Sequence, residues 1–321
     1  MKILVLGSDG LVGKNLQDLV NNDLVNNDLV NNDLVNNDLV NEWFFATRLD
    51  ADLTVFNEVE RLFEKVKPTH VLNLAAYVGG LYKNMSHGVE FFEKNILINM
   101  NVMKASRHVK KLISLMSTCI FPDKIDYPIT EEKLHLGPPH TSNEGYSYAK
   151  RMIDVLSRTY NKQYGTNYVT VIPGNLYGPY DNFNLEDAHV IPALMHKMKN
   201  AKLSGEPLII FGSGNALRQF THASDLARYL IWMLNNYEEK EPLIVSSEEE
   251  YSIFDLVQIL KEEFEYDGEI IWDNTRSDGQ IKKTISSEKL KKLHPNPVFC
   301  NLKDGLKGTI KWFLNSQNYR K

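Results

Sequence analysis

Tyr146 and Lys150 are the residues whose types and spacing first suggest chemistry. They lie four positions apart in the segment 145–150, and this spacing puts both side chains on one face of a helix. There the lysine ammonium would favour the phenolate and lower the pKa of the phenol, which suits a proton donor near neutral pH. A chain of this composition yields about one such pair by chance, so its meaning depends on the residues around it.

Residues 2–13 predict a nucleotide-binding turn. Lys2–Leu6 is an apolar run typical of a strand buried on both faces, and glycines follow it at intervals of three before a helical pattern begins. Such glycines allow a tight turn, close approach of the backbone to a pyrophosphate and packing of the helix on the sheet. The helix N-terminus then faces the phosphate charge. The residues predicted to line this dinucleotide site are Gly7, Gly10, Leu11, Val12 and Gly13.

The segment 18–42 is a low-complexity tract in which Asp-Leu-Val-Asn-Asn occurs four times before a final Asp-Leu-Val-Asn-Glu. A period of five matches neither a helix nor a strand, so no single apolar face persists along it. We expect the first copy to continue the helix that begins at Gly10, and the later copies to form a tolerated surface insertion.

Residues 43–47 predict a second strand, and the residue at its end bears on the choice of cofactor. In nicotinamide-binding folds this position distinguishes the 2′-hydroxyl of the adenosine ribose from a 2′-phosphate. Arg48 is a cation suited to the phosphate, so the sequence favours NADP(H). Asp52 and Leu53 follow, where they could border the adenine.

Further strands are predicted at 71–76 and 111–116, and each ends in residues suited to a ligand. The first ends in Ala75 and Ala76, whose small side chains let a cofactor pass, and the second delivers Ser117-Thr118-Cys119. Strands that alternate with helices imply a parallel sheet, in which ligands bind at the carboxyl ends of the strands. These residues should therefore face one crevice together with the glycine turn.

The pattern as a whole predicts an α/β protein with an NAD(P)-binding Rossmann fold, a doubly wound parallel sheet with a smaller C-terminal α/β substrate lobe. We expect the NADP-binding domain to comprise 1–172 and about 223–248, with the tract at 18–42 as an insertion. About 173–222 and 249–321 should form the substrate-binding lobe.

The residues at the crevice could together carry out a hydride transfer. A hydroxyl at a strand end, Ser117, and the phenol of Tyr146 can both hydrogen-bond one substrate carbonyl. Lys150 can hold the nicotinamide ribose and influence the proton of the phenol. This is the minimum set for transferring a hydride to a carbon that bears oxygen.

These motifs resemble the extended short-chain dehydrogenases/reductases that act on nucleotide sugars. Downstream segments are similar to the GDP-L-fucose synthase family, and the likeness covers essentially the whole chain except the tract at 18–42. The segments that carry it are 117–122, 173–183, 189–194, 211–214, 218–220 and 277–280.

The resemblance implies an NADPH-dependent enzyme that converts GDP-4-dehydro-6-deoxy-D-mannose into GDP-L-fucose. It would epimerise carbons 3 and 5 and then reduce the 4-keto group, which makes the neighbouring C–H bonds acidic. On the pattern of the family, Cys119 and His189 are the acid–base pair for epimerisation. Ser117, Tyr146 and Lys150 serve the reduction.

Other positions follow from the same resemblance, which also implies a homodimer built from helices near 91–109 and 147–163. Gly174 stands where the family usually has threonine, and Phe211 where it usually has tryptophan. The residues implied to contact the cofactor are Leu115, Met116, Ser117, Thr118, Tyr146, Lys150, Pro173, Gly174, Asn175, Leu176 and His189. Those implied to contact the substrate are Asn175, Lys197, Phe211, Arg218 and Asp278.

The composition limits the class of partner. The chain of 321 residues has a net charge of −5 and no basic blocks, which argues against nucleic acid or an anionic membrane. Its only cysteines, Cys119 and Cys300, exclude a disulfide framework and fit a reducing compartment. Because no signal peptide or membrane-spanning run is found, we expect a cytoplasmic protein, and we predict no metal site.

Two other functions remain open. One is a nucleotide-sugar 4-epimerase or 4,6-dehydratase that recycles tightly bound NAD. Such enzymes usually carry an acidic residue soon after the strand-end hydroxyl, whereas Cys119-Ile120-Phe121 follows here. The other is a non-catalytic NADP-binding protein, against which the intact Ser117, Tyr146 and Lys150 argue.

Overall fold

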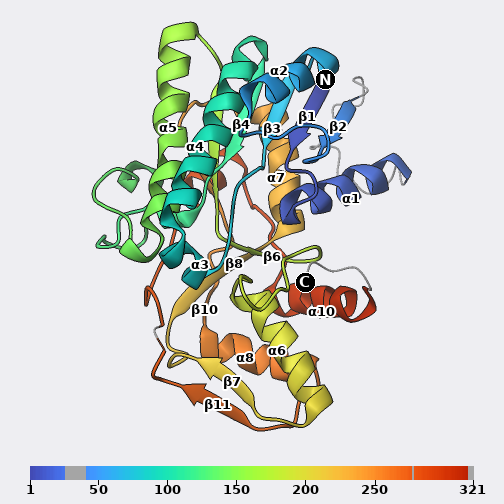
Figure 1. The fold of residues 1–321 in the computed structure, drawn as a ribbon, viewed down its shortest axis with the longest axis vertical. Coiled ribbons are helices and arrows are strands. Elements are labelled where there is room, and N and C mark those ends of the chain that lie inside the picture. The colour runs from blue at the N-terminus through green and yellow to red at the C-terminus, as the bar shows by residue number, and fades with distance from the viewer. Residues whose placement is uncertain (26–40, 277, 317–321) are drawn as a thin grey trace.

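A six-stranded parallel sheet forms the centre of the larger domain (Figure 1). The computed structural model describes residues 1–25, 41–276 and 278–316. The strands follow the order β2-β1-β3-β4-β5-β9. The sheet therefore grows from β1 first toward β2 and then, from β3 on, toward the opposite edge. The strands are β1 (Lys2–Leu6), β2 (Glu42–Ala46), β3 (His70–Asn73), β4 (Lys111–Leu115), β5 (Tyr168–Pro173) and β9 (Leu243–Val245). The predicted α/β Rossmann fold is confirmed.

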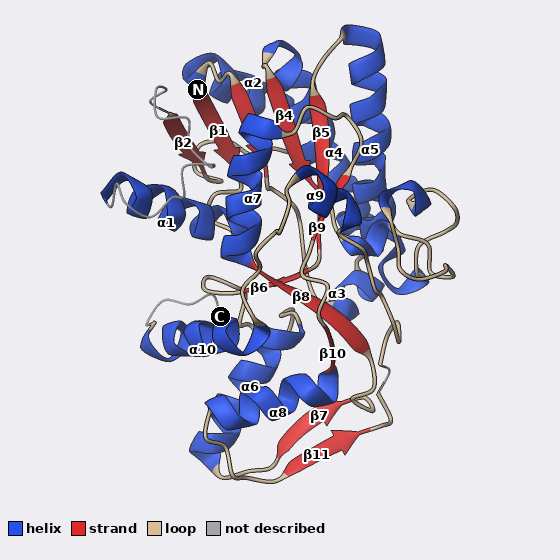
Figure 2. Ribbon diagram, turned by 180° about the vertical axis from the view of Figure 1, so that it is seen from behind, coloured by secondary structure: helices blue, strands red, loops and turns tan. Residues whose placement is uncertain are grey.

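Helices cover both faces of this sheet (Figures 1 and 2). The alternating side chains of β1 show why both faces are apolar. Ile3 and Val5 are buried in one cluster with α1 and α7, whereas Leu4 and Leu6 are buried in another with α2, α4 and α5. These helices are α1 (Leu11–Val25), α2 (Phe56–Val66), α4 (Gly88–Ala105), α5 (Glu144–Tyr164) and α7 (Ala223–Asn236).

A smaller lobe lies below the sheet domain in Figure 1 and has a core of its own. Phe183 and Phe313 stack there with ring centroids 4.3 Å apart. Its three-stranded sheet joins β6 (Asn175–Tyr177), β8 (Leu217–His222) and β10 (Glu250–Ser252), and its two-stranded sheet joins β7 (Leu208–Phe211) and β11 (Ile270–Asp273). Its helices are α6 (Val190–Ser204), α8 (Ile253–Glu263) and α10 (Leu302–Asn315).

Short helices connect these layers. Leu290, in the short helix α9 (Glu288–Leu293), packs in the core of the sheet domain, although the sequence assigned 249–321 to the smaller lobe. The domain boundaries otherwise stay a prediction. The remaining short helices are α3 (Leu81–Ser86), η1 (Ser106–His108), η2 (Thr118–Ile120), η3 (Glu131–Lys133) and η4 (Thr141–Asn143).

The repeat tract begins as predicted. Helix α1 extends to Val25, so the first copy continues the helix after the glycine turn. Residues 26–40, which make up most of the later copies, lie outside the described residues. Among the helices that the structure describes, none is long and apolar enough to cross a membrane.

Candidate active site

The glycine turn after β1 has a geometry that only glycine can adopt. Gly7 has a φ of 75°, and a Cβ there would lie 2.8 Å from the Cα of Ala75. A Cβ at Gly13 would lie 2.5 Å from the Cα of Ser8. Because these glycines have no side chain, the turn leaves a backbone cradle at the start of α1, which fits the pyrophosphate of a dinucleotide. Around it, Leu11 is half-buried, Val12 is buried in the core, and Gly10 N–H donates to the Gly7 carbonyl at 3.1 Å.

The end of β2 lies beside this turn. Ser8 donates to the Ala46 carbonyl through its N–H at 3.2 Å and through its hydroxyl at 2.8 Å. Arg48 follows two residues later and is exposed. Asp52 accepts from the hydroxyl and N–H of Thr54, and these hydrogen bonds lower the pKa of its carboxyl group. Arg48 is therefore near the cradle, while the Asp52 carboxylate is already used within its own loop.

The end of β3 is held by amide side chains from α4. Asn95 accepts from the Tyr77 N–H at 3.1 Å and donates to its carbonyl at 2.9 Å, and Asn99 accepts from Asn73 at 3.0 Å. Both asparagines are buried, so these bonds fix the loop that carries Ala75 and Ala76 beside the glycine turn. Leu53, from the loop after β2, packs half-buried against the same core as Ala75.

The segment after β4 turns sharply to deliver Ser117 and Cys119. Ser117 is extended, and the one-turn helix η2 follows it with Cys119 buried at its centre. Met116, also buried, donates its N–H to the Val171 carbonyl of β5 at 2.8 Å. The carboxyl ends of β4 and β5 thus lie together, and Thr118, between Ser117 and Cys119 in the sequence, is buried as well.

Tyr146 and Lys150 approach this segment from α5. The ammonium of Lys150 donates to the Leu115 carbonyl at 2.8 Å, and its side chain is only 1% exposed. Tyr146 is half-buried, with its ring edge-on to Phe91 at 6.1 Å between centroids. Both side chains interact electrostatically with Cys119. The structure therefore brings together the predicted residues of β4 and α5.

The prediction that the pKa of the Tyr146 phenol is lowered is wrong. Burial raises the pKa of this phenol, and Cys119 adds to the rise. The ammonium instead faces the Leu115 carbonyl, and burial lowers the pKa of Lys150 to about 8. A phenol with a raised pKa stays protonated at neutral pH, so Tyr146 keeps the proton that a general acid must donate.

His189 lies directly before α6. Desolvation by the surrounding protein lowers the pKa of its ring, and Asp187 opposes this shift. Asp187 bonds to Lys83 of α3 at 2.9 Å and to Asn182 at 2.6 Å. The loop that carries His189 is therefore tied to the sheet domain. Among the described residues no hydrogen bond joins His189 to Cys119, so their pairing stays a prediction.

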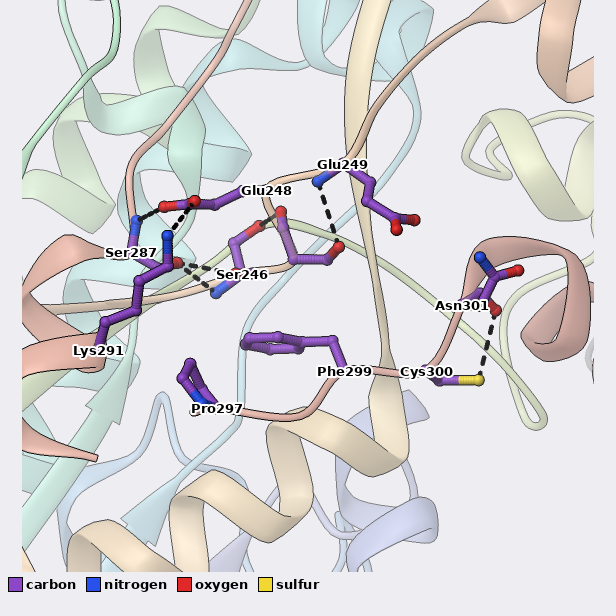
Figure 3. A pocket seen from close by; sticks show the side chains of 10 residues that line it. Ser246, Glu248, Glu249, Ser287, Lys291, Pro297, Phe299, Cys300 and Asn301 are labelled. Carbon is purple, nitrogen blue, oxygen red and sulfur yellow. Dashed lines mark hydrogen bonds and ion pairs between the residues drawn. The ribbon is translucent and has the colours of Figure 1, made fainter. Parts of the chain in front are cut away.

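The segment 173–176 links β5 to β6. Pro173 and Gly174 are buried, Leu176 is half-buried, and Asn175 donates to the Gln219 carbonyl at 2.8 Å. Behind this segment a cavity of about 270 Å³ opens at the carboxyl end of β9 (Figure 3). Its polar side chains satisfy one another, as Glu248 does with Lys291 at 2.5 Å and with the Ser287 N–H at 2.7 Å, so we assign it no ligand.

Four predicted substrate residues lie on the smaller lobe. Phe211, exposed at the end of β7, carries the Lys197 ammonium 3.9 Å from its ring centroid. Asp278 accepts from Ser213 through both oxygens, at 2.7 and 2.8 Å, so it holds the loop after Phe211 in place. Half-buried Arg218 interacts electrostatically with Asp278. Desolvation lowers the pKa of both Lys197 and Arg218.

Two cations near these residues were missed by the sequence reading. Lys283 interacts electrostatically with Cys119 and Arg218, and so lies between the two groups of predicted residues. Arg276 places its guanidinium 5.3 Å from the Phe211 ring centroid. Both lie near Asp278 in a stretch without helix or strand periodicity. The one sequence feature that pointed to this region was the motif at 277–280, which lies between them.

A cavity of about 500 Å³ lies between the two lobes on this side. Leu81 and Met85 of α3 and His140 border it from the sheet domain, and Thr275 and Arg276 border it from the smaller lobe. Because Arg276 also faces Phe211, this cavity continues toward the predicted substrate residues. It is large enough for part of a nucleotide.

A parallel sheet with a glycine turn after its first strand, and a serine, a tyrosine and a lysine at the carboxyl ends of later strands, defines an extended short-chain dehydrogenase/reductase. Comparison with known proteins agrees with this class. Residues 3–249 match the model of the NAD dependent epimerase/dehydratase family.

Curated relatives narrow the class. The chain is 47% identical to the GDP-L-fucose synthase of Dictyostelium discoideum over 98% of its own length and 95% of that protein. It is 43% identical to the probable GDP-L-fucose synthase of Drosophila melanogaster over 99% and 98%. A crystal structure of the Naegleria fowleri GDP-L-fucose synthetase bound to NADP superposes with a TM-score of 0.90, at 42% identity over 99% and 94% of the two chains. The chain belongs to the NAD dependent epimerase/dehydratase family and, within it, to the GDP-L-fucose synthases.

Proposed function

We propose that this protein converts GDP-4-dehydro-6-deoxy-D-mannose into GDP-L-fucose with NADPH. The observation that carries the proposal is the position of Cys119, Tyr146 and Lys150, gathered at the carboxyl ends of β4 and β5 beside the glycine turn. The high identity to GDP-L-fucose synthases over the full chain supports the substrate and the product.

The epimerisation needs an acid and a base next to a ketone. The 4-keto group acidifies the hydrogens on carbons 3 and 5, and removing one of them leaves an enolate with its charge on the keto oxygen. Ser117 and Tyr146 donate hydrogen bonds to that oxygen. We assign these steps to Cys119 and His189: one of them takes the proton from one face of the ring, and the other donates its own proton to the opposite face.

The reduction uses the residues of α5 and β4. When bound, NADPH supplies the hydride that the keto carbon receives. Tyr146 then gives its phenolic proton to the keto oxygen, which becomes the 4-hydroxyl. Lys150 holds the nicotinamide ribose, and its ammonium favours the phenolate that remains. The raised pKa of Tyr146 suits this role because it keeps the donor protonated until the oxygen becomes basic.

The two ends of the substrate site have separate supports. At the cofactor end, exposed Arg48 binds the 2′-phosphate, which gives the preference for NADPH. At the sugar-nucleotide end, Lys197 and Arg218 neutralise the diphosphate, and Phe211 lies against the base or the ribose. Asp278 acts through Ser213 by fixing the position of Phe211.

A homodimer and a cytoplasmic location are part of this proposal. On α4, Val89, Phe92 and Met100 are exposed at helical spacing, and such an apolar stripe fits a second copy of the chain. Sedimentation equilibrium should give a dimer, and Phe92→Glu should shift it toward monomers. Cys119 and Cys300 are free thiols, which suits a reducing cytoplasm, and cell fractionation should find the protein there.

The test is incubation of the purified protein with GDP-4-dehydro-6-deoxy-D-mannose and NADPH, followed by analysis of the products. We expect GDP-L-fucose and NADP in equal amounts. Tightly retained NAD with no net consumption of NADPH would instead indicate an epimerase or dehydratase. A protein that binds NADPH but turns over no keto sugar would be a non-catalytic relative.

A further inference from the structure

Arg151, the residue after Lys150, has a buried charge that the reaction so far does not use. Its side chain is only 5% exposed, and within the described parts of the chain it forms no ion pair with a carboxylate. A buried guanidinium is costly unless all its donors are satisfied. Each hydrogen bond of the guanidinium goes to a backbone carbonyl. The role of Arg151 should therefore lie with the segments that carry these carbonyls.

The bonds of Arg151 converge on the turn that carries Cys119. Nε donates to the Ile120 carbonyl at 2.8 Å, Nη2 donates to the same oxygen, and Nη1 donates to the Gly137 carbonyl at 2.8 Å. Ile120 directly follows Cys119. The guanidinium thereby joins η2 to the loop at Gly137 through a planar fork that an ammonium would not reproduce.

Two neighbouring residues of α5 thus hold the two ends of one short segment. Lys150 binds the Leu115 carbonyl two residues before Ser117, and Arg151 binds the Ile120 carbonyl one residue after Cys119. The bonds within the turn are longer, 3.2 Å from Ile120 N–H to the Ser117 carbonyl and 3.3 Å from Phe121 N–H to Thr118. The position of the thiol therefore depends on the shorter, charge-assisted bonds to Arg151.

We propose that Arg151 is a positioning residue for epimerisation, which holds the Cys119 thiol where it exchanges a proton with the sugar carbon. This inference rests on the function proposed above. The guanidinium also carries a permanent positive charge within electrostatic reach of Cys119, so it favours the negative charge that develops there when the thiol gives up its proton.

Reduction should depend on Arg151 much less than epimerisation. Ser117, Tyr146 and Lys150 are held from the other end of the segment, where Lys150 binds Leu115. Loss of the Arg151 fork should therefore separate the two half-reactions. A general loss of structure would impair both and would also weaken NADPH binding.

The experiment compares wild type, Arg151→Met and Arg151→Lys, with Lys162→Met as a control at an exposed position of the same helix. Deuterium entry at carbons 3 and 5 is measured in D₂O, NADPH affinity by fluorescence, and the isotope effect on the hydride with 4-deuterated NADPH. For Arg151→Met we expect exchange to fall at least about tenfold while NADPH affinity changes less than about twofold. The hydride isotope effect should approach one, because proton transfer becomes limiting.

Arg151→Lys keeps the charge but loses the fork, so its exchange should lie between those of Arg151→Met and wild type. If Arg151→Met does not fold, Arg151→Lys decides alone: slowed exchange at unchanged NADPH affinity supports the inference. Wild-type exchange in either variant overturns it, as does an equal loss of exchange and NADPH affinity. A wild-type protein without exchange or turnover would instead refute the proposed function itself.

Discussion

Gly174 lies directly against Ser246, so closely that a Cβ at residue 174 would be 2.3 Å from the Ser246 hydroxyl oxygen. The same Cβ would lie 2.8 Å from the hydroxyl of Thr221. The Ser246 hydroxyl fills this space and donates to the Ser247 carbonyl at 2.8 Å, with its backbone bonded to Ser287 (Figure 3). The space that a side chain at residue 174 would need is therefore already taken by a serine that directly follows β9.

Gly174→Ala should destabilise the fold by about 1–3 kcal/mol, because the added methyl overpacks a buried site. Gly174→Ala combined with Ser246→Gly should recover much of that loss, since the second change removes the nearest atom. Urea unfolding of the two single variants and the double variant gives the coupling between the residues. Additive losses, or an alanine variant as stable as wild type, would show that the contact does not limit residue 174.

Some helices and strands of this chain could be predicted from the sequence, because the spacing of their apolar side chains indicates which face is buried. The apolar run at Lys2–Leu6 and the motif around Tyr146 were placed correctly, since strands buried on both faces and residues four apart on a helix have few alternatives. The contacts in the crevice that join β4, η2 and α5 depend on tertiary packing. The close contact between Gly174 and Ser246 involves residues far apart in the sequence, so no local pattern predicted it.

Buried cations were the least predictable feature. Lys111 begins β4, yet its ammonium is buried and donates to the carbonyls of Met233, Leu234 and Tyr237, where it caps the end of α7. Arg151 directly follows Lys150, and from the sequence alone an arginine at this position of a helix would be expected to lie in solvent. The sequence pattern around a lysine or arginine is the same whether its charged group lies in water or against a buried carbonyl. Which of the two occurs depends on the tertiary fold.

Tyr146→Phe should separate the two halves of the reaction. Removing the phenolic proton should slow NADPH oxidation by about 100- to 10,000-fold, the usual contribution of a positioned general acid. Exchange of solvent hydrogen into carbons 3 and 5 should persist, because Cys119 and His189 carry it. NADPH absorbance and deuterium analysis by mass spectrometry measure the two rates, and an equal loss of both would contradict this division of roles.

Cys119→Ser should have the opposite effect. A hydroxyl is a much weaker acid than a thiol, so proton exchange at carbons 3 and 5 should slow far more than NADPH binding weakens. Cys119 is buried and the replacement is smaller, so the cofactor cradle at Gly7 should be unaffected. Exchange rates are compared with NADPH dissociation constants from fluorescence titration. Exchange at the wild-type rate would remove Cys119 from the mechanism, and Cys300→Ser serves as the matched control.

Lys150 should give the activity an alkaline limit. Burial lowers its pKa to about 8, so the ammonium that holds the ribose is present below that pH and is lost above it. The value of kcat/KM for NADPH should therefore fall by about tenfold per pH unit above about pH 8. Over the same range the unfolded chain keeps a proton that the folded chain loses, so this group stabilises the fold as pH rises. Activity lost at about pH 9 with unchanged circular dichroism would fit, and a flat profile to about pH 9.5 would not.

His70 should make the fold sensitive to acid. The ring is 8% exposed, lies 2.8 Å from the Thr69 hydroxyl, and has a pKa lowered to about 4, chiefly by burial and then by Lys111. Between about pH 6.5 and pH 4 the unfolded chain binds a proton that the folded chain does not, so stability is present above this range and is lost as pH falls through it. The loss of stability from this residue should reach up to about 3 kcal/mol.

His70→Asn should flatten the pH dependence of the free energy of unfolding, measured by urea unfolding at about pH 7.5 and pH 5. His108→Asn, at an exposed histidine, should leave this pH dependence as in wild type. If His70→Asn loses stability with acid as steeply as wild type, another buried group controls the acid limit.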